Sequence, residues 1–443
     1  DLVRMAVAKA AYVEPLHQVS MDVTGAALVV GGGVAGLEAA LGIAEQGFKA
    51  FLVERSDHLG GNALWMKESW DGEAIGPYVE GLVEKVRRHP NVRIFFKTEA
   101  IETAGILGNF TTTLATGGEM MTTTVVEHGT TIIATGGKEY KPTEYLYGEH
   151  PDVLTHKDFD EALAAGDERI AAADTVAFIQ CVGSRIPERP SCSRVCCTHS
   201  LKSAIKLKSQ KPDMSVFILY RDMRSYGFRE DLYKKAREVG VIFTRYDLDK
   251  LPTATVDGEQ RLTLTVRDHV LGRPVAFNPD LLVLAAAVLP NENQDLFELF
   301  KVPINAEGFL VEAHAKLRPV DFASEGVFMA GLAHYPKSID ETIAQAQAAV
   351  SRAVTVLSKD AILVGGVVAE VNPDRCAVCL TCVRTCPYNT PYIGDEGYAV
   401  IEPSGCHGCG CCVAECPGKA ITLKHFTDEQ LIAKTGALFT DCA

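Results

Sequence analysis

The chain has 443 residues, 47% of them hydrophobic and 23% charged, which is enough for two or three domains with sizeable cores. Its formal net charge of -14 argues against nucleic acid as a partner and offers an acidic surface to other proteins. The most apolar stretch, residues 26–44, is interrupted by five glycines and Glu38, so it does not predict a membrane span.

The N-terminal segment, residues 1–22, is predicted to be a helix and a linker. Residues 1–13 have amphipathic helical spacing with few basic side chains, which favours a docking or linker helix over a membrane anchor. The chain begins with Asp1 rather than Met, which predicts that the natural N-terminus lies further upstream. No stretch resembles a signal peptide, and together with the cysteine pattern below this predicts a cytoplasmic protein.

Residues 23–168 are predicted to be the first part of an FAD-binding Rossmann domain. An apolar strand, residues 26–30, runs into Gly31-x-Gly33-x-x-Gly36 and then into a helical pattern. In this context Gly31 permits the tight turn, Gly33 lets pyrophosphate approach the helix N-terminus, and Gly36 lets helix and strand pack closely. The alternative is a structural glycine turn in another kind of α/β sheet.

Three further features support a dinucleotide site. A second strand, residues 49–53, ends at Glu54, which is placed to hydrogen-bond a ribose hydroxyl. Gly60 and Gly61 follow just beyond it, and the apolar run 131–134 enters a second glycine turn. These features resemble the FAD domain of the glutathione and thioredoxin reductase class. The other predicted FAD-binding residues of this part are Arg55, Gly60, Gly61, Asn62, Ala134, Thr135 and Gly136.

Residues 169–288 are predicted to form a second Rossmann-like domain whose nucleotide loop is replaced. A buried strand, residues 174–180, and a helix, residues 200–208, frame a turn that carries cysteines where the reductase class has its second GxGxxG. Nearby arginines could offset the negative charge of a cluster, so this turn favours an iron-sulfur cluster over zinc or buried thiols. It would be the third cluster of the chain, beside the two predicted below for the C-terminal domain. The four cysteines are Cys181, Cys192, Cys196 and Cys197.

Three polar residues near this turn are weaker candidates. Arg221 and Arg224 follow the next strand, where NADPH enzymes place cations for the 2'-phosphate. Without a glycine loop we expect them to lie around the cluster or at an interface. We expect His199 to cap a helix rather than to bind the cluster.

Residues 289–360 are predicted to complete the FAD domain. A strand ends at Gly331, and Ser338-x-x-Glu341 predicts a capping box that opens the helix 339–356. In the reductase class this helix points at the pyrimidine edge of the flavin, so Gly331 and Ser338 are predicted cofactor-binding residues. Lys337 is the predicted catalytic residue, a cation that tunes the flavin, and the alternative is an ordinary surface lysine.

Residues 361–428 repeat the run CxxCxxCxxxCP of bacterial two-cluster ferredoxins, and residues 429–443 are a predicted tail. In such runs the fourth cysteine binds the other cluster, whereas a zinc ribbon lacks the third and fourth cysteines. Cys411 is expected to be a spare buried thiol, with replacement of Cys412 as the alternative, and Cys442 to be free or part of a cut-off feature. The predicted ligand sets are Cys376, Cys379, Cys382 and Cys416, and Cys406, Cys409, Cys412 and Cys386.

Four segments resemble the HdrA subunits of heterodisulfide reductases and their bacterial relatives: residues 178–185, 192–200, 219–222 with Tyr226-Gly227, and 331–341. The resemblance covers about residues 1–430. It implies an α/β, thioredoxin-reductase-like flavoprotein with two dinucleotide-binding domains and a C-terminal ferredoxin-like 2[4Fe-4S] domain. It also implies one FAD and an extra [4Fe-4S] cluster on the four cysteines of the second domain.

The resemblance further implies work in large cytoplasmic complexes that perform flavin-based electron bifurcation. The expected partners are proteins like HdrB and HdrC of heterodisulfide reductase, a hydrogenase or formate dehydrogenase linker, and ferredoxin. The sequence departs from the methanogen pattern at two points. It does not include their N-terminal iron-sulfur domain, which is consistent with a truncated start. Residues 70–91 simply continue where some of those proteins carry an inserted ferredoxin, which predicts a shorter, bacterial-type protein. An NAD(P)H-linked flavin oxidoreductase, like the small subunit of glutamate synthase, is the alternative function, and a flavin-free assembly scaffold is a third.

Overall fold

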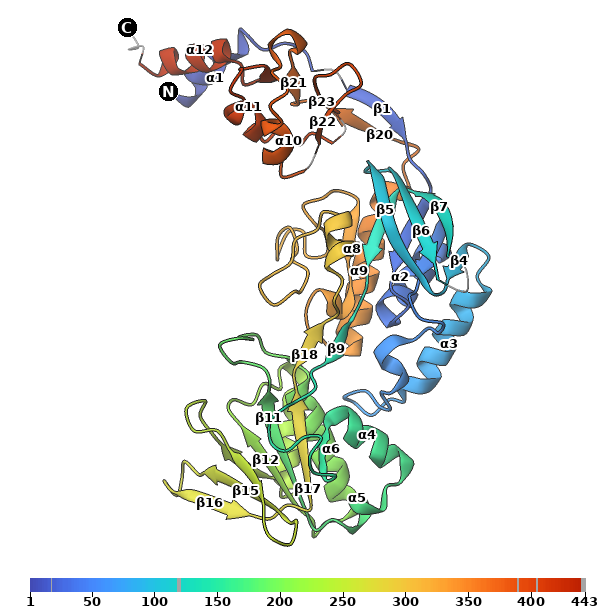
Figure 1. Cartoon of the computed structure of the whole chain (residues 1–443), viewed down its shortest axis with the longest axis vertical. Coiled ribbons are helices and arrows are strands. Elements are labelled where there is room, and N and C mark those ends of the chain that lie inside the picture. The colour runs from blue at the N-terminus through green and yellow to red at the C-terminus, as the bar shows by residue number, and fades with distance from the viewer. Residues whose placement is uncertain (17, 118–120, 389, 404, 440–443) are drawn as a thin grey trace.

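Three parts follow one another along the long axis of the molecule in Figure 1: a C-terminal domain at the top, an α/β domain in the middle and a second α/β domain at the bottom. The computed structural model describes residues 1–439 except residues 17, 118–120, 389 and 404. Cys442 therefore lies outside the described residues.

The middle domain is built on a five-stranded parallel sheet in the order β19-β8-β2-β3-β4. Its central strand β2 is apolar and fully buried, as expected for a parallel strand covered on both faces. Helices cover one face, and an antiparallel sheet with α8 covers the other. The strands of the parallel sheet are β2 (Ala26–Val30), β3 (Lys49–Val53), β4 (Val92–Phe95), β8 (Thr130–Ile133) and β19 (Val327–Met329). The covering elements are α2 (Val34–Glu45), α3 (Ile75–Arg88), α9 (Ile339–Leu357), β5 (Thr98–Ile106), β6 (Asn109–Thr116), β7 (Thr122–His128) and α8 (Gln294–Leu299).

The second α/β domain repeats this plan with the order β10-β17-β11-β12-β13. Helices again cover one face, and a three-stranded antiparallel sheet covers the other. The parallel strands are β10 (Val153–Thr155), β11 (Thr175–Val182), β12 (Ser215–Tyr220), β13 (Ile242–Arg245) and β17 (Leu281–Ala286). The covering elements are α4 (His156–Ala165), α5 (Glu168–Ala172), α6 (Cys196–Gln210), α7 (Glu230–Glu238), β14 (Thr253–Val256), β15 (Leu262–Arg267) and β16 (Pro274–Phe277).

Two short strands join the α/β domains. The chain leaves the middle domain through β9 (Gly137–Glu139) and returns through β18 (Val288–Pro290), and these two strands pair antiparallel. The predicted boundary at residues 168/169 is therefore wrong, because β10 and α4 already belong to the second domain. The sequence did not reveal this crossing, since β10 is only three residues long.

The C-terminal domain is small and contains two antiparallel pairs and two short helices. Its elements are β21 (Ala369–Val371), α10 (Thr381–Thr385), β22 (Pro391–Ile393), β23 (Ala399–Ile401), α11 (Cys411–Glu415) and β24 (Ile421–Leu423). The strand β20 (Ala361–Gly365), which leads into the domain, pairs antiparallel with β1 (Gln18–Asp22).

The first and last described helices of the chain lie together at the top of Figure 1. Helix α1 (Leu2–Ala10) packs beside α12 (Asp428–Leu438), and the Gln430 amide donates to the Tyr12 carbonyl at 2.9 Å. The predicted N-terminal helix is thus present, and Asp428–Leu438, most of which lies in the predicted tail 429–443, also form a helix. Thr427 caps α12 with Gln430, a capping box formed by polar residues that also occur in loops.

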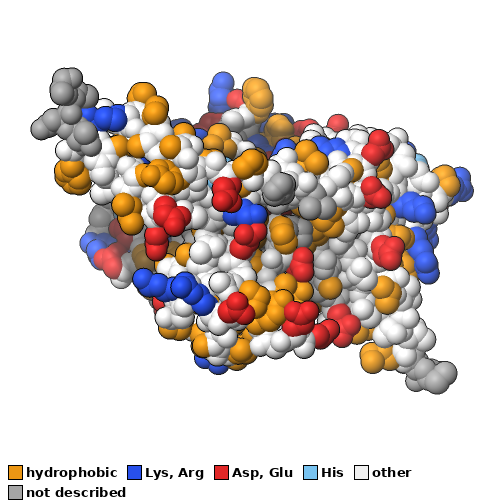
Figure 2. Space-filling model, turned by 90° about the horizontal axis from the view of Figure 1, so that it is seen from above, with side chains coloured by type: hydrophobic (Ala, Val, Ile, Leu, Met, Phe, Trp, Pro, Cys, Tyr) orange, Lys and Arg blue, Asp and Glu red, His pale blue; other side chains and the backbone are white. Residues whose placement is uncertain are grey.

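The surface has mixed character. Figure 2 shows acidic, basic and apolar side chains interspersed on the face seen from above, without a continuous field of Lys and Arg. Among the residues that the structure describes, no helix is both long and apolar enough to cross a membrane.

Candidate cofactor sites

The three predicted glycines of the turn after β2 have two different roles: two are needed for close packing, and one leaves space open. A Cβ on Gly31, whose φ is +112°, would lie 2.3 Å from the Ala134 carbonyl oxygen, and one on Gly36 would lie 1.8 Å from the Gly31 carbonyl oxygen. Both glycines are therefore required for the chain to pack at this turn. A Cβ on Gly33 would meet nothing within 4 Å, so Gly33 leaves the approach to the N-terminus of α2 open.

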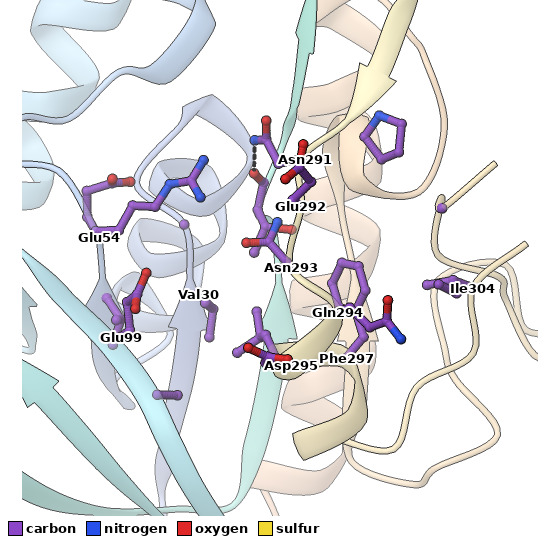
Figure 3. A pocket seen from close by; sticks show the side chains of 18 of the residues that line it. Val30, Glu54, Glu99, Asn291, Glu292, Asn293, Gln294, Asp295, Phe297 and Ile304 are labelled. Carbon is purple, nitrogen blue, oxygen red and sulfur yellow. Dashed lines mark hydrogen bonds between the residues drawn. The ribbon is translucent and has the colours of Figure 1, made fainter.

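Two cavities of about 650 and 330 Å³ lie along this turn and share Gly31, Glu54 and Arg55 in their walls. In the larger cavity, Glu54 and Glu99 lie on one side, and residues 291–297 lie on the other (Figure 3). The cavities together follow the carboxyl ends of the parallel strands, which is where this fold binds dinucleotides. The predicted residues that line the smaller cavity are Gly31, Gly33, Glu54, Arg55, Gly60, Gly61, Asn62, Ala134, Thr135, Gly136 and Lys337.

The polar groups of these cavities are partly paired within the protein. The Glu54 carboxylate accepts from the Gly32 N–H at 2.6 Å and the Ser56 N–H at 2.7 Å, and the Asn291 amide donates to the Thr135 carbonyl at 2.7 Å. Among the described residues, the Thr135 hydroxyl and the Asn293 amide nitrogen are buried without a hydrogen-bond partner. Unpaired buried groups facing such a cavity fit a ligand with polar atoms, as a dinucleotide has.

Lys337 is buried at the N-terminus of α9, so the surface-lysine alternative is excluded. It is 9% exposed, and its Nζ donates to the carbonyls of Gly331 at 2.6 Å and Tyr335 at 2.7 Å. Burial, followed by the nearby Arg194 cation, lowers the pKa of Lys337 to about 7. The Lys337 side chain can therefore exchange between its ammonium and neutral amine forms near neutral pH.

The capping box predicted for this helix is present. The Glu341 carboxylate accepts from the Ser338 N–H at 3.2 Å, and α9 begins at Ile339. Gly331 does not line the two cavities; it has φ +76° and its N–H donates to the Gln345 side chain at 3.0 Å. Gly331 thus positions Lys337 through its carbonyl rather than facing the cavities itself.

A third cavity, of about 480 Å³, lies between the two α/β domains. Lys337 and Leu332 line it from the middle domain, and Cys196 lines it from the second domain. Trp65 and Trp70 are also in its wall. The α9 terminus and the cysteine turn therefore open onto one common space.

The four cysteines of the second domain come together at the end of β11 and the start of α6. Cys181 lies near the end of β11 at φ +62°, and Cys196 and Cys197 open α6, which begins four residues earlier than predicted. Cys181, Cys196 and Cys197 are buried, and Cys192 is half-buried. Burial and the Cys197 sulfur raise the pKa of Cys181 to about 11, whereas hydrogen bonding between Cys196 and Cys197 raises the pKa of Cys196 and lowers that of Cys197.

Within the described residues, no three His, Cys, Asp or Glu side chains converge on a point that could hold a single metal ion. A zinc site requires such convergence, at about 2.3 Å from each sulfur. The four thiolates of a [4Fe-4S] cluster each bind a different iron and therefore stand further apart. The four cysteines of the second domain are predicted to bind such a cluster.

Basic groups surround these cysteines, as expected for an anionic cluster. The Arg185 guanidinium lies 3.9 Å from the Cys181 sulfur, and Arg221 donates to the Arg185 carbonyl at 2.8 Å. His199 does not face the sulfurs as a ligand would, because its Nε2 pairs with Asp160 at 3.1 Å and its ring stacks on His156. Arg221 therefore lies beside the cysteine turn, and the half-buried His199 belongs to a polar network with Asp160 and His156.

The eight predicted ligands of the C-terminal domain divide into the two expected groups. One cavity is lined by all four cysteines of the first predicted set, including Cys416 from the second run. In the second set, burial and then the Cys406, Cys386 and Cys409 sulfurs raise the pKa of Cys412 to about 11. The fourth cysteine of each run thus crosses to the other group, as the ferredoxin pattern predicts.

Backbone amides in this domain point at cysteine sulfurs. Ala399, Ala420 and Ala369 donate N–H bonds of 3.3–3.4 Å to Cys376, Cys416 and Cys406. Such bonds stabilise thiolates and tune cluster potentials.

The expectation for Cys411 was wrong in one respect. Its side chain is exposed, whereas Cys412 is buried beside the other ligands. Both lie in the first turn of α11, and successive helical residues point in directions about 100° apart, so only one of them can face inward.

Three residues join the domains, a role that was not predicted for them from the sequence. Arg194 and Arg229 form ion pairs with Glu341 at 3.0 Å and Asp340 at 2.8 Å, and the Tyr226 hydroxyl donates to Glu341 at 2.7 Å. The only signal was the presence of Arg194 and Tyr226 in the segments that resemble the known family, since more than a hundred residues separate the partners.

Two family models match the chain. Residues 26–176 match the pyridine nucleotide-disulphide oxidoreductase model, and residues 369–417 match the 4Fe-4S dicluster domain model. These matches coincide with the glycine turn and with the two cysteine runs. The chain therefore has the reductase fold, binds FAD and carries iron-sulfur clusters.

Curated relatives match almost the whole chain. The HdrA protein of the H2:CoB-CoM heterodisulfide,ferredoxin reductase of Methanothermobacter marburgensis is 32% identical over 536 residues, covering 100% of this chain and 80% of the relative. The corresponding iron-sulfur protein of the CoB–CoM heterodisulfide reductase of Methanocaldococcus jannaschii is 30% identical, covering 98% of this chain and 80% of the relative. The 536-residue span exceeds the 443 residues of this chain, so the first relative contains inserted segments.

Solved structures of thioredoxin reductases match part of the chain at low identity. The thioredoxin reductase of T. acidophilum has a TM-score of 0.49 and 13% identity, over 75% of this chain and 96% of that chain. The thioredoxin reductase of Lactococcus lactis has the same TM-score, with 16% identity over 75% of this chain and 98% of that chain.

Proposed function

The chain belongs to the HdrA family of heterodisulfide reductases and is an FAD-dependent oxidoreductase, and from this premise we propose that it is the electron-transfer component of a larger redox complex. It carries one FAD and three [4Fe-4S] clusters and passes electrons to protein partners, ferredoxin among them. Bound FAD supplies the exchange between electron pairs and single electrons, and each cluster carries one electron. The complex is cytoplasmic and performs flavin-based electron bifurcation.

The observation that carries this proposal is the cavity of about 480 Å³ between the α/β domains. Its wall contains Lys337, at the predicted flavin end, and Cys196, at the predicted cluster end. A flavin and a third cluster held at these ends would border one space. This arrangement favours electron transfer within the chain over a nucleotide site in the second domain.

Each group of residues has a separate task in the proposal. Gly33 and the N-terminus of α2 bind the pyrophosphate, and Glu54 accepts a hydrogen bond from a ribose hydroxyl. Lys337 would supply a positive charge near the bound flavin, and such a charge would stabilise an anionic reduced form. The four cysteines of the second domain hold the third cluster, and the eight cysteines of the C-terminal domain hold the other two.

The partners follow from the relatives. The names of three relatives include CoB-CoM heterodisulfide and ferredoxin; two of these names also include H2, and one of the two includes formate as well. For this chain we propose proteins like HdrB and HdrC of heterodisulfide reductase and a hydrogenase or formate dehydrogenase linker as partners.

Anaerobic iron, acid-labile sulfide and flavin analysis tests the cofactor content. Three [4Fe-4S] clusters require about twelve irons per chain, and the flavin analysis should give one FAD. Recovery of only eight irons from fully reconstituted protein would contradict the third cluster.

Rapid mixing with NADH and NADPH separates this function from the NAD(P)H-linked alternative. The Tyr140 ring lies against Gly183, where a Cβ would meet it at 2.4 Å, and buried cysteines fill the rest of the turn that would hold pyrophosphate. We therefore expect neither nucleotide to reduce the flavin rapidly in the isolated protein. Fast, stoichiometric bleaching by either one would favour the NAD(P)H-linked enzyme.

A further inference from the structure

Arg194 contacts both the cysteine turn of the second domain and the N-terminus of α9. Its backbone N–H donates to the Cys192 sulfur at 3.3 Å, in a conformation with φ +60° that non-glycine residues rarely adopt. Its guanidinium donates to Glu341 at 3.0 Å and to the Pro336 carbonyl at 3.3 Å. One residue thus joins a predicted cluster ligand to the segment that contains Lys337.

The position of the guanidinium is fixed by more than one partner. It also donates to the Tyr226 hydroxyl at 2.9 Å and lies 5.2 Å from the centre of the Tyr226 ring. The side chains of Arg194 and Glu341 are 34% and 27% exposed, so their ion pair alone would contribute little. The planar Arg194 guanidinium, however, donates to three acceptors at once: the Glu341 carboxylate, the Pro336 carbonyl and the Tyr226 hydroxyl. A lysine could not fix the geometry in this way.

The contacts that Arg194 makes near the start of α9 involve residues close to Lys337 in the chain. Pro336 precedes it, and Glu341 closes the capping box with Ser338, which follows it. The charged or titratable groups that face Lys337 are Arg194 from the cysteine loop, Glu341 from α9, and Glu312 from a separate loop; His334 lies three residues before it. Movement of Arg194 would therefore change both the position of Lys337 and the charge around it.

We propose that Arg194 is a positioning residue that couples the third cluster to the flavin site, so that a change at either site alters the redox properties of the other. This proposal rests on the proposed function, because it requires the third cluster. The coupling is reciprocal, since a free energy that links two sites acts in both directions.

The first test is the Arg194→Met variant of the full chain, studied anaerobically at pH 6, where Lys337 is protonated with or without Arg194. Iron and FAD are counted first. We expect both to be retained and the flavin midpoint potential to fall, with a change of about fivefold or more in the ratio of reduced to oxidised flavin, as is typical of coupled sites. Arg194→Lys keeps the charge but loses the fork, and we expect an intermediate value.

The reciprocal test is Glu341→Gln, which keeps a residue able to complete the capping box but removes the ion pair with Arg194. We expect the low-temperature EPR signal of the third cluster to change without loss of iron. Arg245→Met is the matched control, because Arg245 is an exposed cation of the same domain that pairs with Asp222. We expect it to leave the flavin potential unchanged.

An unchanged flavin potential in Arg194→Met would overturn the coupling, whether or not the third cluster is retained. An equal fall in Arg245→Met would also overturn it, because the effect would then be one of overall charge. Eight irons in the wild-type protein would instead overturn the third cluster itself, so the two failures are distinguishable.

Discussion

The two α/β domains have the same plan and differ in one turn. Each has a five-stranded parallel sheet, helices on one face and a three-stranded antiparallel sheet on the other. After β2 the turn carries glycines, and after β11 it carries cysteines. The fold therefore provides a binding position at the carboxyl end of the central strand, and a few residues in the turn decide what is bound there.

The physical difference lies in what each turn leaves accessible. The first turn keeps Gly33 open beside a helix N-terminus, where backbone N–H groups and the helix dipole favour an anion. The second turn buries three thiols and starts its helix with two of them. Buried sulfur beside arginines favours a thiolate-bound cluster over a bound pyrophosphate.

Loss of a cysteine from the second turn should have the largest effect. We expect Cys196→Ala to reduce iron from about twelve to about eight per chain, because a [4Fe-4S] cluster needs four thiolates. The two C-terminal clusters and the FAD should remain. Iron analysis with EPR spectroscopy measures this.

Cys411→Ala is the matched control, since Cys411 is exposed and outside both predicted ligand sets. It should keep the full iron content. Loss of all three clusters in Cys196→Ala would mean that the second turn has a structural role in the whole chain.

In the first turn, Gly36→Ala should destabilise the protein itself. The new Cβ would lie 1.8 Å from the Gly31 carbonyl oxygen, and both atoms belong to a turn that cannot move without displacing α2 from β2. Overpacking of this kind costs about 1–3 kcal/mol or more. We expect a lower melting temperature and loss of FAD, measured by calorimetry and by flavin release. An unchanged melting temperature would show that α2 is not held against β2 at this point.

Gly33→Ala should separate binding from folding. A Cβ at this position meets no protein atom within 4 Å, so we expect the melting temperature of the FAD-free protein to stay unchanged. The methyl group would instead face the pyrophosphate and weaken FAD binding by about tenfold or more, which is about 1.4 kcal/mol. Titration of the FAD-free protein with FAD measures the affinity. Full affinity would place the pyrophosphate elsewhere.

The sequence predicted the parts of these sites that depend on local spacing. Glycines two and three residues apart after an apolar strand, and cysteines in the run CxxCxxCxxxCP, impose their geometry within a few residues. The capping box of Ser338 and Glu341 is equally local, because its two partners are three residues apart. Short-range patterns of this kind can be recognised without knowledge of the fold.

The remaining features depend on the fold. Arg194 and Glu341 are 147 residues apart, and no local pattern connects them. The pairing of β1 with β20, and of α1 with α12, likewise joins distant parts of the chain. The burial of Lys337 also arises from tertiary packing, since its neighbours in sequence would suit an exposed helix start.

The smallest predicted effect concerns Lys337, which has no counterpart in the second domain's turn. Because burial lowers its pKa to about 7, the Lys337 side chain is mostly a charged ammonium at pH 6 and mostly a neutral amine at pH 9. At pH 6, Lys337→Ala should remove a contact worth about 1–2 kcal/mol to an anionic reduced flavin. Since about 30 mV corresponds to 1.4 kcal/mol for a two-electron couple, the midpoint should fall by about 20–40 mV with FAD still bound. Anaerobic redox titration measures the shift.

The sign of the pH dependence makes this prediction specific to a buried lysine. Because the charge is present below a pKa of about 7 and absent well above it, the difference between wild type and Lys337→Ala should shrink as the pH rises to 9. Lys138→Ala is the comparison, because the Lys138 side chain is 48% exposed, pairs with Glu292 and lies at the rim of the same cavity. Solvent screens its charge, so its effect should be smaller and nearly independent of pH over this range. If the midpoint of Lys337→Ala falls equally at pH 6 and pH 9, Lys337 acts through packing rather than charge. If the midpoint does not change, the helix terminus and backbone amides tune the flavin instead.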